Sequence, residues 1–403
     1  MSLHIQHGFP LLLGSVVARD VMSDVHLAGR IVTMRSYQAV LLLLAALAVF
    51  AFYYLGSGRE NFSSTTRRMK ESGAVHSVMP DLDLLPASSS ELKLGEGKSK
   101  SLESRGVQDF HLLMMFTKVD RSPGLRDKFQ LALRSMLRYG KLESTEVLNL
   151  HFVTDEPSKE IGKSVLRDLL QGASFKYKVI FHDVSTLTEK LFPIVEAMQK
   201  LFSAGTGTYY SDSIFFLSVA LHQIMPKDIS RIIQLDLDLK FQTNIRELFE
   251  EFDNFLQNSV IGIAHEMQPV YRHTFWQYRR ENPNTKVGSP PPDGMPGFNS
   301  GVMLLNLEAM RQSSLYNQML EPNAVRLLAD KYHFKGHLGD QDFFSMIGME
   351  HPELFYVLDC GWNRQLCTWW KDHGYADIFD LYYKCESHIK IIHGNCNTPI
   401  PEE

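Results

Sequence analysis

Residues 231–241 read Arg231-Ile-Ile-Gln-Leu-Asp-Leu-Asp-Leu-Lys-Phe241, an apolar run that leads straight into two carboxylates one residue apart. Side chains alternate along a strand with a period of two, so Asp236 and Asp238 point the same way where the strand ends. The ends of parallel strands form the usual ligand edge of an open α/β sheet. Carboxylates there suit magnesium or manganese, which in turn holds a diphosphate. The alternative is a solvated strand end, because chance alone produces about one D-x-D in such a chain.

Strands and helices alternate on both sides of this segment. Helical periodicity follows the first two predicted strands, at residues 125–138 and 158–170, and two further helical stretches lead to Pro226. Continuous apolar runs predict the other strands at 111–117, 147–153, 177–181, 259–264, 298–306 and 389–394. The alternation predicts a parallel, doubly wound sheet with a nucleotide at its strand ends. No G-x-G-x-x-G or Walker A sequence follows the first strand, which argues against dinucleotide and P-loop chemistry.

The segment from 265 to 297 is long, aromatic and rich in proline and glycine. A long loop beside a ligand edge is usually functional. Its Trp276 and Tyr278 form either a surface that recognises an acceptor or a small core of the loop itself. Further along, Gly339-Asp-Gln-Asp-Phe343 is expected to open a helix.

The N-terminal quarter of the chain differs from the rest. Residues 37–56 (YQAVLLLLAALAVFAFYYLG) carry no charge over about one bilayer thickness of helix, which predicts a membrane span. The alternatives are a buried core helix and a cleaved signal peptide. Residues 57–107 are polar and read as a flexible stem, with one glycosylation acceptor at Asn61. We therefore expect an N-terminal segment at 1–36, an anchor at 37–56, the stem, and a catalytic domain at 108–403, with the start methionine open between Met1 and Met34.

Composition constrains the partners and the compartment. The chain has 403 residues and a net charge of −5, with no basic run that would suit nucleic acid. Counting positive charges beside the span does not support a cytosolic N-terminus. All of the cysteines lie near the C-terminus, which favours two disulfides in an oxidising lumen over a zinc site and leaves three pairings open; they are Cys360, Cys367, Cys385 and Cys396. We therefore expect the C-terminal body to be lumenal.

Polar residues follow or open three of the apolar runs. Asp236 with Asp238, Asn299 with Ser300, and His393 are placed to converge on one site. Two carboxylates and one imidazole with open positions suit manganese better than zinc or calcium. Taken alone, His393 is more often an ordinary hydrogen-bonded histidine.

Together these motifs resemble glycosyltransferase family 8, whose members are retaining nucleotide-sugar transferases with a GT-A type, Rossmann-like fold. The motifs are the D-x-D, F-N-S-G-V-M-L-L-N-L, G-D-Q-D-F, W-N and I-I-H-G, and the resemblance covers about residues 110–399. The resemblance is strongest to those members of the family that transfer xylose in the endoplasmic reticulum. It implies a single-pass type II membrane protein with a lumenal catalytic domain, with the Golgi as the alternative location. The implied oligomeric state is open between a monomer and a homodimer.

The implied reaction moves xylose from UDP-xylose, in α-1,3 linkage, to the xylose of a xylosyl-glucose disaccharide. That glycan is O-linked to serine on EGF-like repeats, as in Notch-like receptors and clotting factors. The alternatives are another family 8 transferase, placing xylose on glucose or glucose on a protein, and a non-catalytic lumenal protein that binds EGF glycans.

The resemblance also implies roles for matching residues. Asp236, Asp238 and His393 would hold manganese, with magnesium as the alternative, and Asp236 would also touch the ribose. The residues implied for the nucleotide and donor sugar are Met115, Phe116, Thr117, Ser211, Asp212, Asn299, Ser300 and Gly301. Those implied for the acceptor are Trp276, Tyr278, Trp362 and Asn363. The implied disulfides are Cys360–Cys385 and Cys367–Cys396.

Gln341 and Asp342 would sit under the sugar ring as the catalytic pair. Gln341 is a poor nucleophile, so we expect substitution on the front face of the sugar, with Asp342 as the alternative nucleophile. If these residues have no catalytic role, they cap a helix, and Asn299 and Ser300 close a turn. One departure from the family is clear: the lysine that usually contacts the diphosphate after the late histidine is absent, and Asn395 or a backbone amide is expected to replace it.

Overall fold

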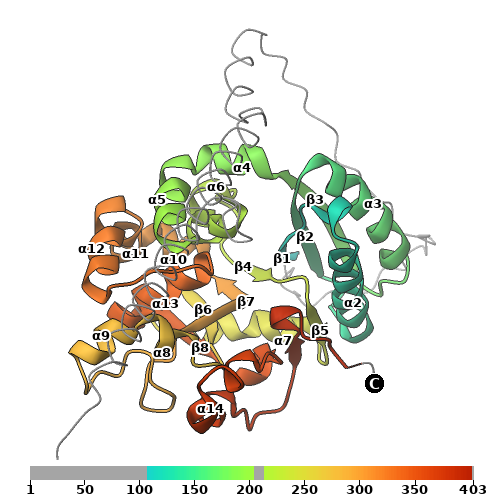
Figure 1. Cartoon of the computed structure of the whole chain (residues 1–403). Helices are drawn as coiled ribbons and strands as arrows, with labels where there is room; N and C mark the ends of the chain where they lie inside the picture. The colour runs from blue at the N-terminus through green and yellow to red at the C-terminus, as the bar shows by residue number, and fades with distance from the viewer. Residues whose placement is uncertain (1–106, 204–212, 402–403) are drawn as a thin grey trace, which may run out of the picture. The chain divides into compact units, whose positions relative to one another are not determined.

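The computed structural model describes residues 107–203 and 213–401, and these form one compact unit (Figure 1). Within them, a main sheet of seven strands has the order β3-β2-β1-β4-β7-β6-β8. Its strands are β1 (Gln108–Met115), β2 (Glu146–Thr154), β3 (Lys176–Asp183), β4 (Ile232–Leu235), β6 (Ile261–His265), β7 (Phe298–Leu305) and β8 (Phe355–Leu358). A small sheet has the order β5-β10-β9, with β5 (Leu239–Phe241), β9 (Arg364–Gln365) and β10 (Ile391–His393).

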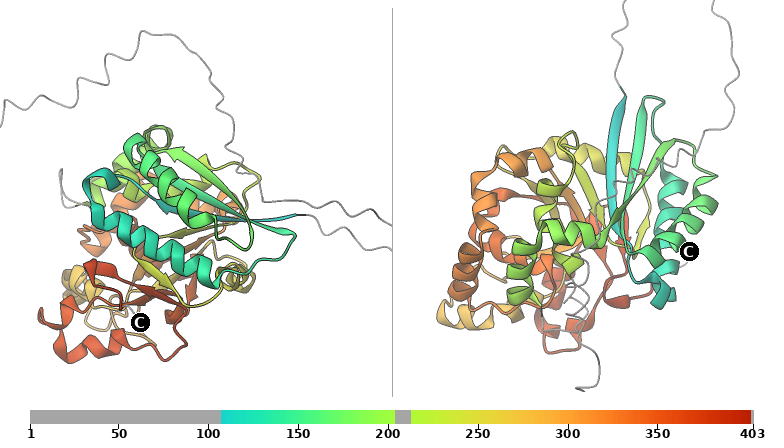
Figure 2. Two further views of the ribbon diagram at one scale, coloured as in Figure 1. Left: turned by 90° about the vertical axis from the view of Figure 1, so that its right-hand side faces the viewer. Right: turned by 90° about the horizontal axis from the view of Figure 1, so that it is seen from above.

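Helices cover both faces of the main sheet. They are α2 (Pro123–Tyr139), α3 (Glu156–Leu170), α4 (Val184–Lys190), α5 (Phe192–Phe202), α6 (Leu221–Ile224), α7 (Ile245–Glu250), α8 (Val270–Thr274), α9 (Trp276–Glu281), α10 (Leu307–Gln312), α11 (Ser314–Met319), α12 (Pro322–Tyr332), α13 (Asp340–Glu350) and α14 (Ala376–Tyr383). Helices α2 and α3 lie on one side of the main sheet, and α10 to α13 lie on the other (Figure 2). Each side has its own hydrophobic core, with Phe129 and Val165 in one and Val195 and Phe343 in the other.

Local sequence explains the first βα units. All nine residues of β2 are buried, as expected of an interior strand in a parallel sheet. Helix α2 begins with Pro123 in its first turn and ends at Gly140, whose N–H donates to the Met136 carbonyl. Helix α3 begins at Asp155, whose side chain accepts a hydrogen bond from the Ser158 N–H.

The sheet is mixed, and the prediction of a parallel sheet is wrong for β7. Strands β1 to β4 pair in parallel, but β7 runs antiparallel to β4 and to β6. Because β7 is reversed, its first residues lie beside the end of β4, where Leu235 pairs with Val302. A parallel β7 would have placed Asn299 at the opposite edge. The reversal therefore brings the two polar motifs to the same edge.

Two further expectations change in detail. The last predicted strand belongs to the small sheet, where β10 pairs antiparallel with β5. The segment 265–297 is not a plain loop, because it forms α8 and α9.

The predicted segments 1–36 and 37–56, and all of 57–107 except its last residue, lie outside the described residues, as does Asn61. In the part of the chain that the structure does describe, no helix has the length and apolar character to cross a membrane.

Candidate active site

The D-x-D lies in a bend between β4 and β5, not within a strand. The Asp236 N–H donates to the Gly301 carbonyl at 2.9 Å, which ties the bend to β7. Strand β10 pairs with β5 so that His393 lies opposite Leu239, and the Gly394 N–H donates to the Asp238 carbonyl. His393 is thereby set directly beside the two carboxylates.

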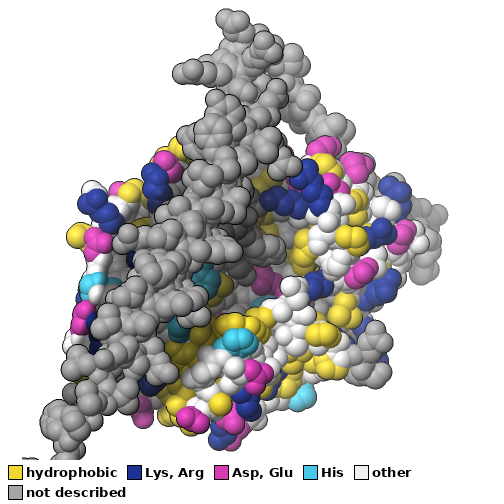
Figure 3. Space-filling view, viewed as in Figure 1, with side chains coloured by type: hydrophobic (Ala, Val, Ile, Leu, Met, Phe, Trp, Pro, Cys, Tyr) yellow, Lys and Arg dark blue, Asp and Glu magenta, His cyan; other side chains and the backbone are white. Residues whose placement is uncertain are grey.

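Asp236, Asp238 and His393 form one compact cluster. His393 Nε2 lies 3.6 Å from Asp236 Oδ2 and 3.3 Å from Asp238 Oδ1, and the candidate ligand atoms all lie within 4.8 Å of one another. The Asp236 side chain is 50% exposed, whereas His393 is almost fully buried at 3%. Acidic and histidine side chains are visible in the hollow on the face shown in Figure 3. Carboxylate oxygens and one imidazole, open to solvent on one side, fit a divalent cation such as manganese.

The cluster is strongly coupled electrostatically. Although burial opposes the change, the hydrogen bond with Asp238 and the charges of Asp238, Asp236 and Glu266 raise the pKa of His393. Burial likewise opposes the change at Asp238, but His393 and Lys128 lower the pKa of that carboxyl. Positive charge is therefore favoured at this site, as a cation-binding site requires.

A buried network of amides orients His393. His393 Nδ1 lies 2.9 Å from Asn363 Oδ1, and Asn363 Nδ2 donates to Asn299 Oδ1 at 2.9 Å. Asn299 Nδ2 in turn donates to Glu266 Oε2 at 3.0 Å. Because Asn363 Oδ1 accepts the Nδ1 proton, Nε2 is the nitrogen left to face the carboxylates. Gly301 makes room for this ring, since a Cβ atom there would lie 2.3 Å from His393 Cε1.

Glu266 is a site residue that the sequence analysis missed. It directly follows β6 and is 3% exposed, and burial raises its pKa to about 7. Its Oε2 also accepts a hydrogen bond from Gln341 Nε2 at 3.4 Å. The signal in the sequence was a carboxylate directly after an apolar strand, the same signal that singled out the D-x-D.

Helix α13 begins at the same edge, as Gly339 predicted, and it adds a second missed residue, Asp340. Asp340 accepts hydrogen bonds from the hydroxyls of Ser218 and Ser300. Burial raises the pKa of this carboxyl to about 7. Gln341 Oε1 accepts a hydrogen bond from the Ser300 N–H at 3.3 Å. Asp340 and Gln341 therefore face the start of β7.

Asp342 is directed elsewhere. Its Oδ2 accepts hydrogen bonds from the N–H groups of His337 and Leu338, and its Oδ1 accepts one from the Tyr271 hydroxyl. The side chain is 1% exposed. These bonds hold the turn before α13 and give no support to a nucleophile. They are not the helix cap expected as the alternative, because the donors precede the N-cap residue Gly339.

Several other implied residues are buried in the fold. Phe116 is fully buried and packs against Phe129 with ring centroids 4.4 Å apart, so its side chain is not available to a nucleotide. Trp362 is 1% exposed and donates to Glu251, and Asn363 holds His393, so neither offers a surface to an acceptor. Met115 and Thr117 are half-buried at the end of β1, and Ser211 and Asp212 lie outside the described residues.

The two α9 residues predicted to bind the acceptor differ: one is exposed, as an acceptor surface requires, and the other belongs to a core. Trp276 is 53% exposed, with the Arg280 guanidinium over its ring. Tyr278 instead packs against the core and Tyr332, with ring centroids 4.8 Å apart. Trp276 alone is presented to solvent.

Asn395 is fixed through its side-chain oxygen. Its Oδ1 accepts hydrogen bonds from the N–H groups of Leu366 and Cys367. The structure contains both implied disulfides, Cys360–Cys385 and Cys367–Cys396. Together they tie the segment around His393 to the preceding turn.

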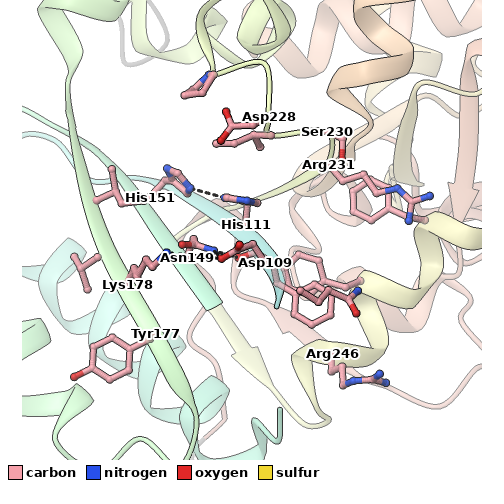
Figure 4. A pocket seen from close by; sticks show the side chains of 18 of the residues that line it. Asp109, His111, Asn149, His151, Tyr177, Lys178, Asp228, Ser230, Arg231 and Arg246 are labelled. Carbon is pink, nitrogen blue, oxygen red and sulfur yellow. Dashed lines mark hydrogen bonds and ion pairs between the residues drawn. The ribbon is translucent and has the colours of Figure 1, made fainter. Parts of the chain in front are cut away.

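A separate cavity of about 1250 Å³ lies toward the starts of β1–β3, away from the D-x-D. Three histidines from adjacent strands form a chain along it, with 3.0 Å between His111 Nδ1 and His151 Nε2, and 2.9 Å between His151 Nδ1 and His182 Nε2. Figure 4 shows the first two with Asp228 and Lys178 around them. Its charged groups are largely paired, as Arg231 is with Asp253, so we place the chemistry at the D-x-D.

Comparison with known proteins agrees with this geometry. The family model "Glycosyl transferase family 8" matches residues 142–395. Xyloside xylosyltransferase 1 of Mus musculus is 68% identical over 380 residues, which cover 93% of this chain and 96% of that protein. The Homo sapiens protein of the same name is 68% identical over 379 residues, with 93% and 96% covered.

A solved structure extends the likeness to three dimensions. The crystal structure of mouse Xyloside xylosyltransferase 1 in its apo form matches with a TM-score of 0.70 and 73% sequence identity. The match covers 73% of this chain and 100% of that one. The chain therefore belongs to glycosyl transferase family 8 and is a glycosyltransferase.

Proposed function

We propose that this protein is a retaining, manganese-dependent transferase that moves xylose from UDP-xylose, in α-1,3 linkage, to the xylose of a xylosyl-glucose disaccharide. The 68% identity to two proteins named Xyloside xylosyltransferase 1 supports the class of reaction. The convergence of Asp236, Asp238 and His393 on one cation-sized cluster is the structural observation that carries the proposal.

The D-x-D, with His393, is the part of the site that would hold the cation. When bound, the cation would stabilise the negative charge that develops on the leaving diphosphate. His393 would contribute Nε2, because Asn363 keeps the ring proton on Nδ1. A metal-bound Nε2 carries no proton, so metal affinity falls as the pH is lowered, and the acidic neighbours that raise the pKa of His393 against burial strengthen this dependence.

The donor sugar would lie between the start of β7 and the start of α13. Ser300, Asp340 and Gln341 place a hydroxyl, a carboxylate and an amide side by side there. Such groups recognise the hydroxyls of a sugar ring by hydrogen bonding. Glu266 accepts a hydrogen bond from the Gln341 amide, so the orientation of that amide is fixed before the donor binds.

Front-face substitution fits the positions of these side chains. Gln341 would stabilise positive charge at the anomeric carbon through its carbonyl dipole, without forming a bond. The leaving phosphate would accept the proton of the acceptor hydroxyl. Double displacement needs a free carboxylate at the far face of the sugar, and the Asp342 oxygens already accept three hydrogen bonds.

The acceptor and the location belong to the same proposal. The disaccharide would be O-linked to serine on EGF-like repeats, as in Notch-like receptors and clotting factors. The protein would be a single-pass type II protein of the endoplasmic reticulum, anchored by residues 37–56. Two disulfides in the C-terminal body support an oxidising lumen.

A donor panel tests the proposal. Purified protein is incubated with UDP-xylose, UDP-glucose and UDP-galactose, with manganese or with a chelator, and released UDP is measured. We expect hydrolysis of UDP-xylose that requires the metal. Preference for UDP-glucose would indicate another transferase of the family, and UDP binding without turnover on any donor would indicate a non-catalytic glycan-binding protein.

A further inference from the structure

Lys128 contacts the candidate metal cluster from a helix that the family motifs do not include. It lies on α2, and its Nζ donates to Asp238 Oδ2 at 3.2 Å and to Asn397 Oδ1 at 2.8 Å. Its side chain is 29% exposed, so the ammonium group is at the rim of the site. Packing of α2 on β5 holds this position, because the Ser135 hydroxyl accepts a hydrogen bond from the Phe241 N–H.

The surroundings of Lys128 leave room for an anion beside Asp238. A cavity of about 330 Å³ borders both side chains, and Lys240, Asn397 and Thr398 also line it. The segment after His393 offers no cation toward this space. Its Asn395 oxygen is turned inward to backbone N–H groups, and Cys396 is held in a disulfide.

Lys128 and a divalent cation compete for the same carboxylate. In the metal-free protein, the ammonium group neutralises the Asp238 oxygen that faces it. A divalent cation on Asp238 would bring like charges within a few ångströms of each other, which repel strongly near a protein surface. A lysine with a flexible four-carbon stem is able to move away from that contact at little cost.

We propose that Lys128 exchanges partners when the donor binds: it neutralises Asp238 in the metal-free protein and contacts the nucleotide diphosphate once the metal occupies the site. A diphosphate bridged by the metal would lie next to Asp238 and carry the negative charge that Lys128 needs there. The inference rests on the proposed function, since it requires a nucleoside diphosphate at the D-x-D. It assigns the missing lysine's contact to a different element of the fold.

Two binding constants with opposite responses follow from this exchange. Lys128→Met removes the competing cation, so manganese alone binds severalfold more tightly. The same change removes one charge-assisted contact to the diphosphate, so UDP binds about tenfold more weakly in saturating manganese. A purely structural lysine would move both affinities in the same direction or neither.

Calorimetry on the purified full-length protein measures both constants, first with manganese chloride and then with UDP in saturating manganese. Lys240→Met is the matched control, because Lys240 lines the same cavity but donates to the Pro401 carbonyl instead of Asp238. We expect the control to keep both wild-type affinities. Thermal unfolding of all three proteins checks that each is folded.

The possible outcomes test the exchange of partners by Lys128 separately from the proposed function. Tighter manganese binding together with weaker UDP binding in Lys128→Met supports the exchange. Wild-type values for both, weaker binding of both, or a change in manganese affinity alone would each overturn it. Absence of manganese and UDP binding in the wild-type protein would instead reject the proposed function itself.

Discussion

Two clusters that contain histidine lie in different sheets of the fold, and their neighbours shift the histidine pKa values in opposite directions. At the end of β4, His393 faces Asp236 and Asp238, and these acidic neighbours raise its pKa against the effect of burial. In the cavity toward the starts of β1–β3, His111, His151 and His182 face one another. There, burial lowers the pKa of His151 to about 3, and the two neighbouring imidazoles add to the effect.

The two clusters differ in the partners of their imidazole nitrogens. In the chain of three, His151 uses both of its ring nitrogens on the neighbouring rings, and His111 and His182 each use one on His151. At the catalytic edge, Asn363 engages only Nδ1, and Nε2 shares its space with carboxylate oxygens. Among the described residues, the ligand atoms gathered within 4.8 Å of one another, as a cation site requires, are those of Asp236, Asp238 and His393.

The largest expected effect comes from the catalytic cluster. Asp236→Asn, Asp238→Asn and His393→Ala should each abolish manganese-dependent UDP binding, because each removes one ligand of a hard-cation site. Titration calorimetry with UDP and manganese measures this. His151→Gln is the matched control and should bind normally. Wild-type affinity in His393→Ala would remove the histidine from the site and erase the contrast between the clusters.

Gln341 is expected to matter for turnover and not for binding. Gln341→Ala should lower kcat about 10²-fold, the order seen when one preorganised dipole is lost, with UDP affinity unchanged. Measuring kcat together with the calorimetric affinity for UDP distinguishes an effect on turnover from an effect on binding.

Intact mass spectrometry after incubation with UDP-xylose and no acceptor probes the mechanism further. We expect no adduct on the wild-type protein, whereas Gln341→Glu introduces a carboxylate that would trap the sugar if double displacement were available. A pentose on wild-type Asp342 would contradict front-face substitution.

The histidine chain should make the folded protein sensitive to acid. The pKa of His151 falls from 6.5 to about 3 on folding, so below pH 6.5 the unfolded state binds more protons than the folded state. Stability from this residue is complete above that pH and decreases as the pH falls toward 3.

From pH 7 to pH 5 His151 alone should reduce the free energy of unfolding by about 2 kcal/mol. Urea titrations at the two pH values measure the loss, and His151→Gln should show a smaller one. An equal loss of unfolding free energy in the wild-type and His151→Gln proteins would mean that the three histidines are not the acid-sensitive element.

The smallest expected effect concerns the acceptor side. Trp276 is exposed on α9, far along the chain from both histidine clusters. Trp276→Ala should raise the acceptor KM severalfold while UDP-xylose hydrolysis is unchanged, as expected for lost acceptor binding alone. Trp276→Phe should restore part of the affinity. Equal damage to hydrolysis and transfer would show that α9 supports the fold instead.

Some of this site could be read from local patterns. The apolar run before Asp236, the glycine before α13 and the late Ile-Ile-His motif each marked an element end near its true place. Such patterns act over a few residues, where side-chain periodicity and capping are decided. The family motifs then indicated which of these ends carry the chemistry.

What the sequence by itself determined is most strands of the main sheet, the helices α2, α3 and α13, the D-x-D with its histidine, and the α/β class, whereas β5, β8, β9, α8 and α9 were not predicted. Only the tertiary structure decided the direction of β7, the inward turn of Trp362 and Asn395, and the approach of Glu266 and Lys128 to the site. Lys128 and Asp238 are 110 positions apart in sequence and meet only because α2 packs on β5. No local pattern encodes such a contact, since it depends on how whole elements pack against one another.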